Sequence, residues 1–285
     1  MATLRDIRRR IGSVRNTMQI TNAMKMVSTA KLNRAQNAVR AAQPYAEQLR
    51  HMVTTMAAGL SREDHPLLKP SEGGKPVVML YTSDRGLCGA FNAQLNKALY
   101  RALAHESMKG AELVVFGRQG NEFFRRRGVP IRKAITHAVE VEKAAALRET
   151  IRELQGEFVE GKVSKVFLAY NRFKSAIGQE PRVVQLLPIE PPIEDEEERD
   201  TREVLFEPSR GEVLDMLLPN YLDNQCFLAH LNTEAGEHGA RMVAMDGATR
   251  NAKEMINRLT LQMNKARQAA ITKELIEIVN GAQAL

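Results

Sequence analysis

Reactive side chains gather at one place, the segment 82–92 that follows a short apolar run. A hydroxyl, a carboxylate, a guanidinium and a thiol lie close together there, on Ser83, Asp84, Arg85 and Cys88. The carboxyl end of a strand is where open α/β sheets bind ligands. The segment contains neither G-x-G-x-x-G nor G-x-x-x-x-G-K-[ST], so it does not indicate a phosphate-binding loop.

The same segment has a structural interpretation. Gly86 and Gly89 would permit positive φ angles or close packing in a tight turn. A nucleophilic Cys88 would need a base, and the six histidines are scattered without a recognisable spacing. The H-E-x-x-H pattern and paired cysteines are absent. We favour the structural interpretation and expect no catalytic, cofactor-binding or metal site.

The segment belongs to a middle region of short apolar strands and helices. The expected strands are 76–82, 112–116, 163–170 and 182–189, and the expected helices are 93–105, 121–127 and 138–160. Such alternation predicts a βα-type sheet with largely buried strands. Pro188, Pro191 and Pro192, together with the acidic run Glu194–Glu198, predict an exposed linker.

A seven-residue apolar repeat runs through the C-terminal region. One of its positions holds Leu228, Ala235, Met242, Thr249, Ile256, Met263 and Ala270. The companion position holds Leu231, His238, Met245, Ala252, Leu259 and Ala266. The alternating spacing predicts one long helix with a coiled-coil seam and left-handed supercoiling. His238 is expected to be a tolerated polar residue of this seam rather than a ligand.

A second heptad, in the N-terminal region, supplies a partner helix. It consists of Ile7, Val14, Thr21, Ser28, Ala35, Ala42, Leu49 and Met56. Its flank is expected to change side, from Leu4, Ile11 and Met18 to Ala38, Tyr45 and Met52. Pro44 and Pro219 are the positions where proline would kink or interrupt the two helices.

The two chain ends therefore predict an antiparallel helix pair around the middle region. The expected fold class is α/β, with a long antiparallel two-helix coiled coil formed by the N- and C-terminal helices and an inserted Rossmann-like α/β domain. The expected division is 1–58 for the first coiled-coil helix, 59–207 for the α/β domain and 208–285 for the second helix.

The totals leave two other classes of function open. The net charge of +7 permits a coiled-coil scaffold that binds nucleic acid, although the basic residues are spread out. The middle region permits a nucleotide-binding α/β enzyme. The two cysteines form no motif and suggest a reducing compartment. Because no signal segment and no run of about 18 apolar residues occurs, we expect a protein that is neither secreted nor membrane-spanning.

Five stretches carry a resemblance to a known family. They are 4–11 (LRDIRRRI), 20–32 (ITNAMKMVSTAKL), 82–92 (TSDRGLCGAFN), 237–249 (EHGARMVAMDGAT) and 264–277 (NKARQAAITKELIE). Together they resemble the gamma subunit of the rotary proton-translocating ATP synthase. A start directly at the first motif, without a transit peptide, resembles bacterial members.

The resemblance implies a rotor without a catalytic site or cofactor. The helix pair would enter a ring of alternating alpha and beta subunits, and the α/β domain would form the foot against the epsilon subunit and the c-ring. The delta subunit would belong to the same complex. Proton-driven rotation of the c-ring would then drive ATP synthesis, or run in reverse as ATP-driven proton pumping. The implied location is peripheral, on the cytoplasmic face of the bacterial plasma (inner) membrane.

The resemblance also implies three groups of partner-binding residues. The expected contacts with a loop of beta are Met24, Lys25, Arg267, Gln268, Thr272 and Glu277. The expected tip inside the alpha/beta sleeve comprises Ile276, Ile278, Val279 and Ala282. The expected contacts with the c-ring and epsilon are Leu205, Phe206 and Glu207. The alternative for each polar position is a solvated helix face.

Two positions depart from the family pattern. Lys25 stands where many members carry an acidic residue, and Lys273 where many carry glutamine. Both add positive charge, so the ion pairing at these positions stays open.

Overall fold

A computed structural model describes residues 3–57, 65–71, 73–190, 207 and 209–283. Its contacts divide the chain into two units, residues 1–29 with 241–285, and residues 30–240. The three-part division expected from the sequence stays a prediction.

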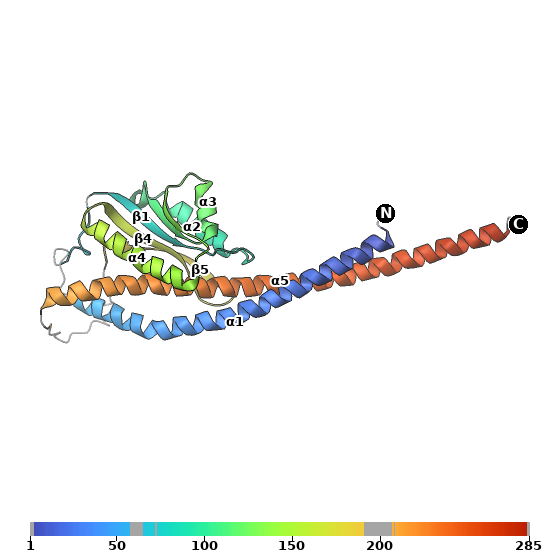
Figure 1. The fold of residues 1–285 in the computed structure, drawn as a ribbon, viewed down its shortest axis with the longest axis horizontal. Coiled ribbons are helices and arrows are strands. Elements are labelled where there is room, and N and C mark those ends of the chain that lie inside the picture. The colour runs from blue at the N-terminus through green and yellow to red at the C-terminus, as the bar shows by residue number, and fades with distance from the viewer. Residues whose placement is uncertain (1–2, 58–64, 72, 191–206, 208, 284–285) are drawn as a thin grey trace. The chain divides into compact units, whose positions relative to one another are not determined.

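Two long helices begin and end the described chain, α1 over Leu4–Ala57 and α5 over Arg210–Gln283 (Figure 1). Each begins with a capping interaction. The Asp6 amide donates to Thr3 Oγ1 at 3.2 Å, while the Thr3 amide donates to Asp6 Oδ2 at 3.2 Å. Ser209 Oγ accepts from the Glu212 amide at 3.3 Å. Both helices continue through their internal prolines, Pro44 and Pro219.

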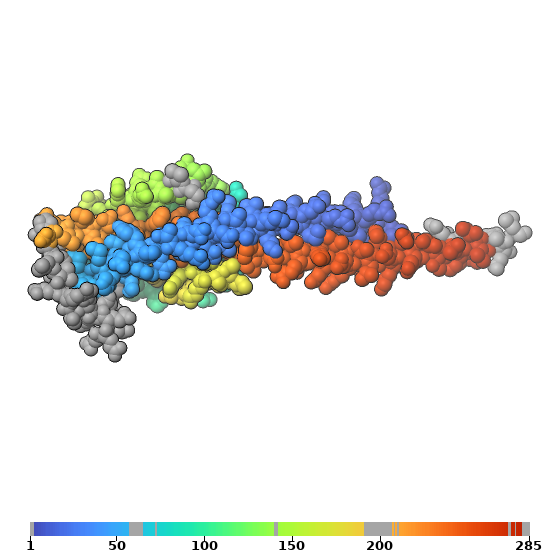
Figure 2. All heavy atoms as spheres, turned by 90° about the horizontal axis from the view of Figure 1, so that it is seen from below, coloured from blue at the N-terminus to red at the C-terminus, as the bar shows by residue number. Residues whose placement is uncertain are grey.

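The predicted seam positions face inward along both helices. Every residue of the first-helix heptad is buried or half-buried, and so is every residue of the two C-terminal seam positions. Figure 2 shows side chains of the two helices lying against each other. The expected long helices and heptads are therefore confirmed.

The expected change of flank on α1 is wrong. Tyr45 and Met52 are exposed, whereas Leu32, Ala46 and Val53 are buried. These three residues continue the spacing of Leu4, Ile11 and Met18 without a shift, because each lies a multiple of seven residues further on. The flank therefore keeps its side, as a continuous heptad repeat requires.

The second unit contains a five-stranded sheet of order β3-β2-β1-β4-β5. Its strands are β1 Lys75–Tyr81, β2 Glu112–Phe116, β3 Ile131–Ile135, β4 Val163–Phe173 and β5 Gln179–Leu187. The first four are parallel to their neighbours, and β5 runs antiparallel to β4. The edge strand β3 was not predicted from the sequence, because Arg132 and Lys133 interrupt its apolar residues.

Helices cover both faces of this sheet (Figure 1). The helices are α2 Phe91–Ala102, α3 Arg118–Arg125 and α4 Glu140–Val159, and a 3-10 turn spans Glu106–Met108. Successive side chains of β1 point to opposite faces, so Met79 packs in the core with α4 and the two long helices, while Leu80 packs with α2 and α3. Both faces of the sheet are thus buried, as the apolar strands predicted.

Two glycines of α5 allow it to lie close to the sheet and its hairpin. A Cβ at Gly236 would lie 2.9 Å from Phe91 Cε2, and one at Gly239 would lie 3.1 Å from the Ala176 Cα. One turn earlier, Asn232 Oδ1 accepts a hydrogen bond from the Phe173 amide at 3.1 Å. A side chain at Gly239 would therefore press on the backbone of the hairpin at Ala176.

Gly239→Leu should lower the free energy of unfolding by about 1–3 kcal/mol, because the new side chain must displace backbone of the hairpin. The control is Gly12→Leu, at an exposed position of α1 with nothing within 4 Å of a new Cβ. It should raise helix stability slightly, since glycine is a poor helix former. Denaturant unfolding followed by circular dichroism makes the comparison. Equal effects of the two substitutions would contradict close packing at Gly239.

Candidate functional site

The turn after β1 is closed by its own side chains. The Ser83 amide donates to Asn92 Oδ1 at 3.0 Å, and Asn92 Nδ2 donates to Ser83 Oγ at 2.7 Å and to Cys88 Sγ at 3.2 Å. Ser83 Oγ in turn donates to the Arg85 carbonyl at 2.7 Å. Ser83, Cys88 and Asn92 are all buried. Their polar atoms hold the turn together rather than face a ligand.

Asp84 joins three loops at the carboxyl ends of the parallel strands. Its Oδ1 accepts from the amides of Arg118 at 3.0 Å and His137 at 3.1 Å, and its Oδ2 lies 2.8 Å from Lys143 Nζ. Burial tends to raise the pKa of Asp84, but the Lys143 hydrogen bond and the two backbone amides outweigh it. The pKa of Asp84 is therefore lower than usual. The Asp84 carboxylate thus holds together the loops at the edge of the sheet where α/β folds bind ligands.

Glycines make the close approach at this edge possible. A Cβ at Gly117, where φ is 103°, would lie 2.1 Å from the Thr82 carbonyl oxygen, so only glycine fits. Gly89 has a positive φ of 59°, as the structural interpretation expected. Gly86 does not have a positive φ. The next residue, Leu87, has one instead, at 61°.

Asp84→Asn should lower the free energy of unfolding by about 1–3 kcal/mol at pH 7, because Lys143 loses a partner that is mostly buried. Because the pKa of Asp84 is depressed by folding, its stabilisation is present above the unfolded value of about 3.9 and is lost as pH falls through the folded value. The difference between wild type and variant should therefore shrink below about pH 4. Denaturant titrations across this range test it, with Glu149→Gln on an exposed part of α4 as the control. A difference that is constant with pH would exclude the carboxylate as its source.

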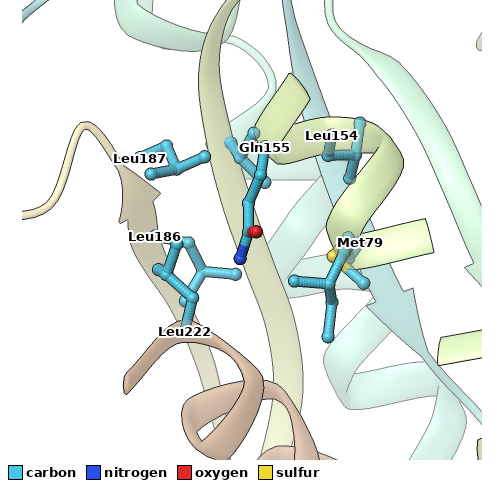
Figure 3. Close-up of a pocket in the computed structure, with 8 residues that line it drawn as sticks. Met79, Leu154, Gln155, Leu186, Leu187 and Leu222 are labelled. Carbon is cyan, nitrogen blue, oxygen red and sulfur yellow. The ribbon is translucent and has the colours of Figure 1, made fainter. Parts of the chain in front are cut away.

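An apolar pocket of the second unit offers no reactive group (Figure 3). It is lined by Met79, Ile151, Leu154, Gln155, Val166, Leu186, Leu187 and Leu222. Its volume is about 210 Å³ with open solvent included, less than the roughly 300–1,000 Å³ of ligand pockets. Gln155 is its only polar lining residue, so the pocket has no group for acid–base or nucleophilic chemistry.

The described residues contain neither a metal site nor a membrane span. No group of three or more His, Cys, Asp or Glu side chains within them could hold a metal ion. None of the described helices is long and apolar enough to cross a bilayer. The thiol of Cys226 is fully buried, and burial raises its pKa far above the usual range. It is therefore held as the thiol, which is a poor nucleophile.

The first unit contains a polar contact between its two helices. Lys25 Nζ lies 2.6 Å from Asp246 Oδ1, and the hydroxyls of Thr21 and Thr249 are 2.8 Å apart. Arg250 Nη2 lies 3.1 Å from Asp246 Oδ2. The hydrogen bond from Lys25 is the main reason that the pKa of Asp246 is lowered. Asp246 was not among the residues predicted from the sequence, although it directly follows the seam residue Met245.

The other expected partner-binding residues lie on exposed helix surface or outside the described residues. Met24 is half-buried, whereas Arg267, Gln268 and Thr272 are exposed. Thr272 Oγ1 donates to the Gln268 carbonyl one turn earlier in α5, at 2.9 Å. Leu205 and Phe206, and the side chains of Glu277 and Ala282, lie outside the described part, and Glu207 is exposed.

The end of α5 extends past the start of α1 within the first unit (Figure 1). From Arg267 to Asn280, every described side chain is exposed except that of Ala270, which is half-buried. Several of the exposed residues are large and apolar, namely Ile271, Leu275, Ile276, Ile278 and Val279. A large exposed apolar surface indicates a site of protein–protein interaction.

Comparisons with known proteins agree with this arrangement. A family model described as ATP synthase matches residues 3–285. The chain is 47% identical over 285 residues to the ATP synthase gamma chain of Moorella thermoacetica, with both chains fully covered. It is 48% identical over 293 residues to that of Anaeromyxobacter sp. strain Fw109-5, again with full coverage of both.

Solved structures share the fold at lower identity. A chain of the Euglena gracilis mitochondrial ATP synthase, in a structure of its OSCP, F1 and c-ring, gives a TM-score of 0.68 at 20% identity, with 99% of this chain and 94% of that chain covered. A chain from the central stalk and c-ring of the Tetrahymena thermophila enzyme gives 0.58 at 23% identity, with 80% and 99% covered. With a family model over almost its whole length and full-length relatives near half identity, the chain belongs to the ATP synthase gamma-chain family.

Proposed function

We propose that this chain is the rotor of an ATP synthase central stalk and contributes no catalytic residue of its own. The observation that carries the proposal is the unpaired end of α5. It presents large apolar side chains to solvent, among them Leu275 at 57% and Ile278 at 67% exposure. A helix in that state needs a surrounding protein surface, and the sleeve of alpha and beta subunits would supply one.

The coupling in this proposal is mechanical. Rotation of the c-ring, driven by protons, turns the chain, and its asymmetric shaft drives the beta subunits through their conformational cycle in ATP synthesis. The reverse direction pumps protons at the expense of ATP. Two distant sites are thereby linked by a coupling free energy carried through a stiff element. The paired helices of the first unit are such an element.

Contacts with a loop of beta are assigned to Met24, Arg267, Gln268, Thr272 and Glu277. Arg267 is exposed and lies one residue beyond the seam position Ala266, so its planar fork of donors is free of the seam. Lys25 contributes less to this contact with beta than the other residues do, because its ammonium group is already paired with Asp246.

The tip and the foot complete the set of proposed contacts. Ile276, Ile278, Val279 and Ala282 form the tip inside the alpha/beta sleeve. Leu205, Phe206 and Glu207 face the c-ring and epsilon at the foot. The delta subunit belongs to the same complex. The chain then lies on the cytoplasmic face of the bacterial plasma membrane, where it is held by these partners.

Replacing both Arg267 and Gln268 with alanine should leave the helices folded and lower ATP turnover of the reconstituted complex roughly 2- to 10-fold, because charged hydrogen bonds at a partly desolvated contact are lost. Circular dichroism of the chain separates folding from function, and the yield of assembled complex separates assembly from turnover. The matched control is Lys253→Ala, which removes an exposed charge elsewhere on α5 of the same unit. Unchanged assembly, turnover and proton pumping would show that both side chains are merely solvated.

The isolated chain should neither bind nor hydrolyse ATP, because the turn after β1 is filled by Ser83, Asn92 and Cys88 and lacks a phosphate-binding loop. Titration calorimetry with Mg-ATP should give no saturable heat. A micromolar affinity would support the nucleotide-binding enzyme instead and would count against a purely mechanical role.

A further inference from the structure

One stripe of α1 is apolar at every heptad position except one. Residues seven apart share a face of a coiled-coil helix. The stripe consists of Leu4, Ile11, Met18, Lys25, Leu32, Val39, Ala46 and Val53. The adjacent stripe carries its two hydroxyl residues, Thr21 and Ser28, at the same level. On α1, the polar residues of these two stripes therefore lie together in one short stretch.

The facing stretch of α5 supplies polar partners for Lys25 and Thr21. Asp246 accepts the Lys25 hydrogen bond at 2.6 Å, and Thr249 meets Thr21 at 2.8 Å. Arg250 flanks the carboxylate from the next turn of α5. The two interhelical contacts run in opposite sequence directions, as an antiparallel pair requires.

Stability alone does not explain the arrangement. The side chains of Lys25 and Asp246 are 40% and 35% exposed, and ion pairs in such positions contribute only about 0–1 kcal/mol. An apolar residue at position 25 would have buried more apolar surface. A single polar position in a seam has a different known effect, because it selects one register among several.

We propose that Lys25 and Asp246 specify the axial register of the two helices in the first unit, so that Lys25 is a positioning residue within the chain. The hydrogen bond between Thr21 and Thr249 supports the same register. This pairing does not depend on the rotor role and would stand if that role were disproved.

The heptad disfavours both neighbouring registers. A slip of one heptad in one direction places Lys253 where Asp246 lies, and two ammonium groups then face each other. A slip in the other direction places Gly239 there, and Lys25 loses its carboxylate. In either case Thr21 would face a methionine or isoleucine, Met242 or Ile256, and would lose its hydroxyl partner.

The seam itself specifies register weakly. Seam residues such as Thr21, Ser28 and Ala252 have small side chains, which interlock less than large branched ones. Both helices continue unbroken into the second unit, so a slip in the first unit requires the helices to shift or break in the second unit as well. The proposed pair therefore selects the register together with the packing of the two helices on the sheet.

Spin-label distances in the full chain test the register. Labels on Asn16→Cys and Asn264→Cys occupy exposed positions of α1 and α5, and the native thiols of Cys88 and Cys226 are buried. The two labelled positions are offset along the axis, so a slip toward Lys253 shortens the distance and a slip toward Gly239 lengthens it. One heptad corresponds to about 10 Å of axial displacement.

Wild type should give one narrow distribution. Lys25→Asp, which is repelled by Asp246 and attracted by Lys253, should shift part of the population to shorter distances. Adding Asp246→Lys should restore the native distance, and Lys25→Arg should keep it. Arg15→Asp makes the same change of charge at an exposed position of α1 and should have no effect.

If Lys25→Asp prevents folding, Lys25→Met provides the second variant. It continues the apolar stripe and should keep the helix while broadening the distribution. An unchanged narrow distribution in Lys25→Asp, or in Lys25→Met where the first is unfolded, would overturn the proposal. The proposal would also be overturned if the double variant Lys25→Asp with Asp246→Lys gave a label distance no closer to the wild-type distance than Lys25→Asp alone.

Discussion

Close pairing of the first and last helices is the constraint on which both units depend. A helix of 54 residues and one of 74 residues must each keep an apolar face over many turns. That is possible only if the heptad repeats without a shift, since a straight helix would rotate its face away by about 20° per heptad. The observed burial pattern meets the condition, and it explains why the flank of α1 keeps its side at Leu32, Ala46 and Val53.

The sheet of the second unit is built onto the same pair. One of its two cores contains residues of α1 and α5 as well as β1 and α4, so the sheet buries that face only by packing with the long helices. The edge at the carboxyl ends of the parallel strands, where α/β folds bind ligands, is closed by Asp84, Ser83 and Asn92. A ligand-binding architecture thus serves here as an anchor for the helices, which illustrates that fold class alone does not determine function.

The sequence was most informative where a pattern was long. Two heptads over many turns predicted the helices, their antiparallel pairing and their seam residues. The edge strand β3 was missed because Arg132 and Lys133 interrupt its apolar residues. The close approach at Gly117 and the three loops joined by Asp84 depend on residues far apart in the chain, which no local pattern reveals.

The role of Lys25 required the structure as well as the family resemblance. The resemblance predicted a contact of Lys25 with beta, and the positive charge of Lys25 differs from the acidic residue of many members. The structure supplies an acidic partner, Asp246, on the other helix. A change of charge at one seam position can be tolerated when the facing position carries the opposite charge, because the pair and its register are then preserved. At the end of α5, by contrast, the described large apolar side chains are exposed, and exposed apolar surface of this kind indicates a protein–protein contact.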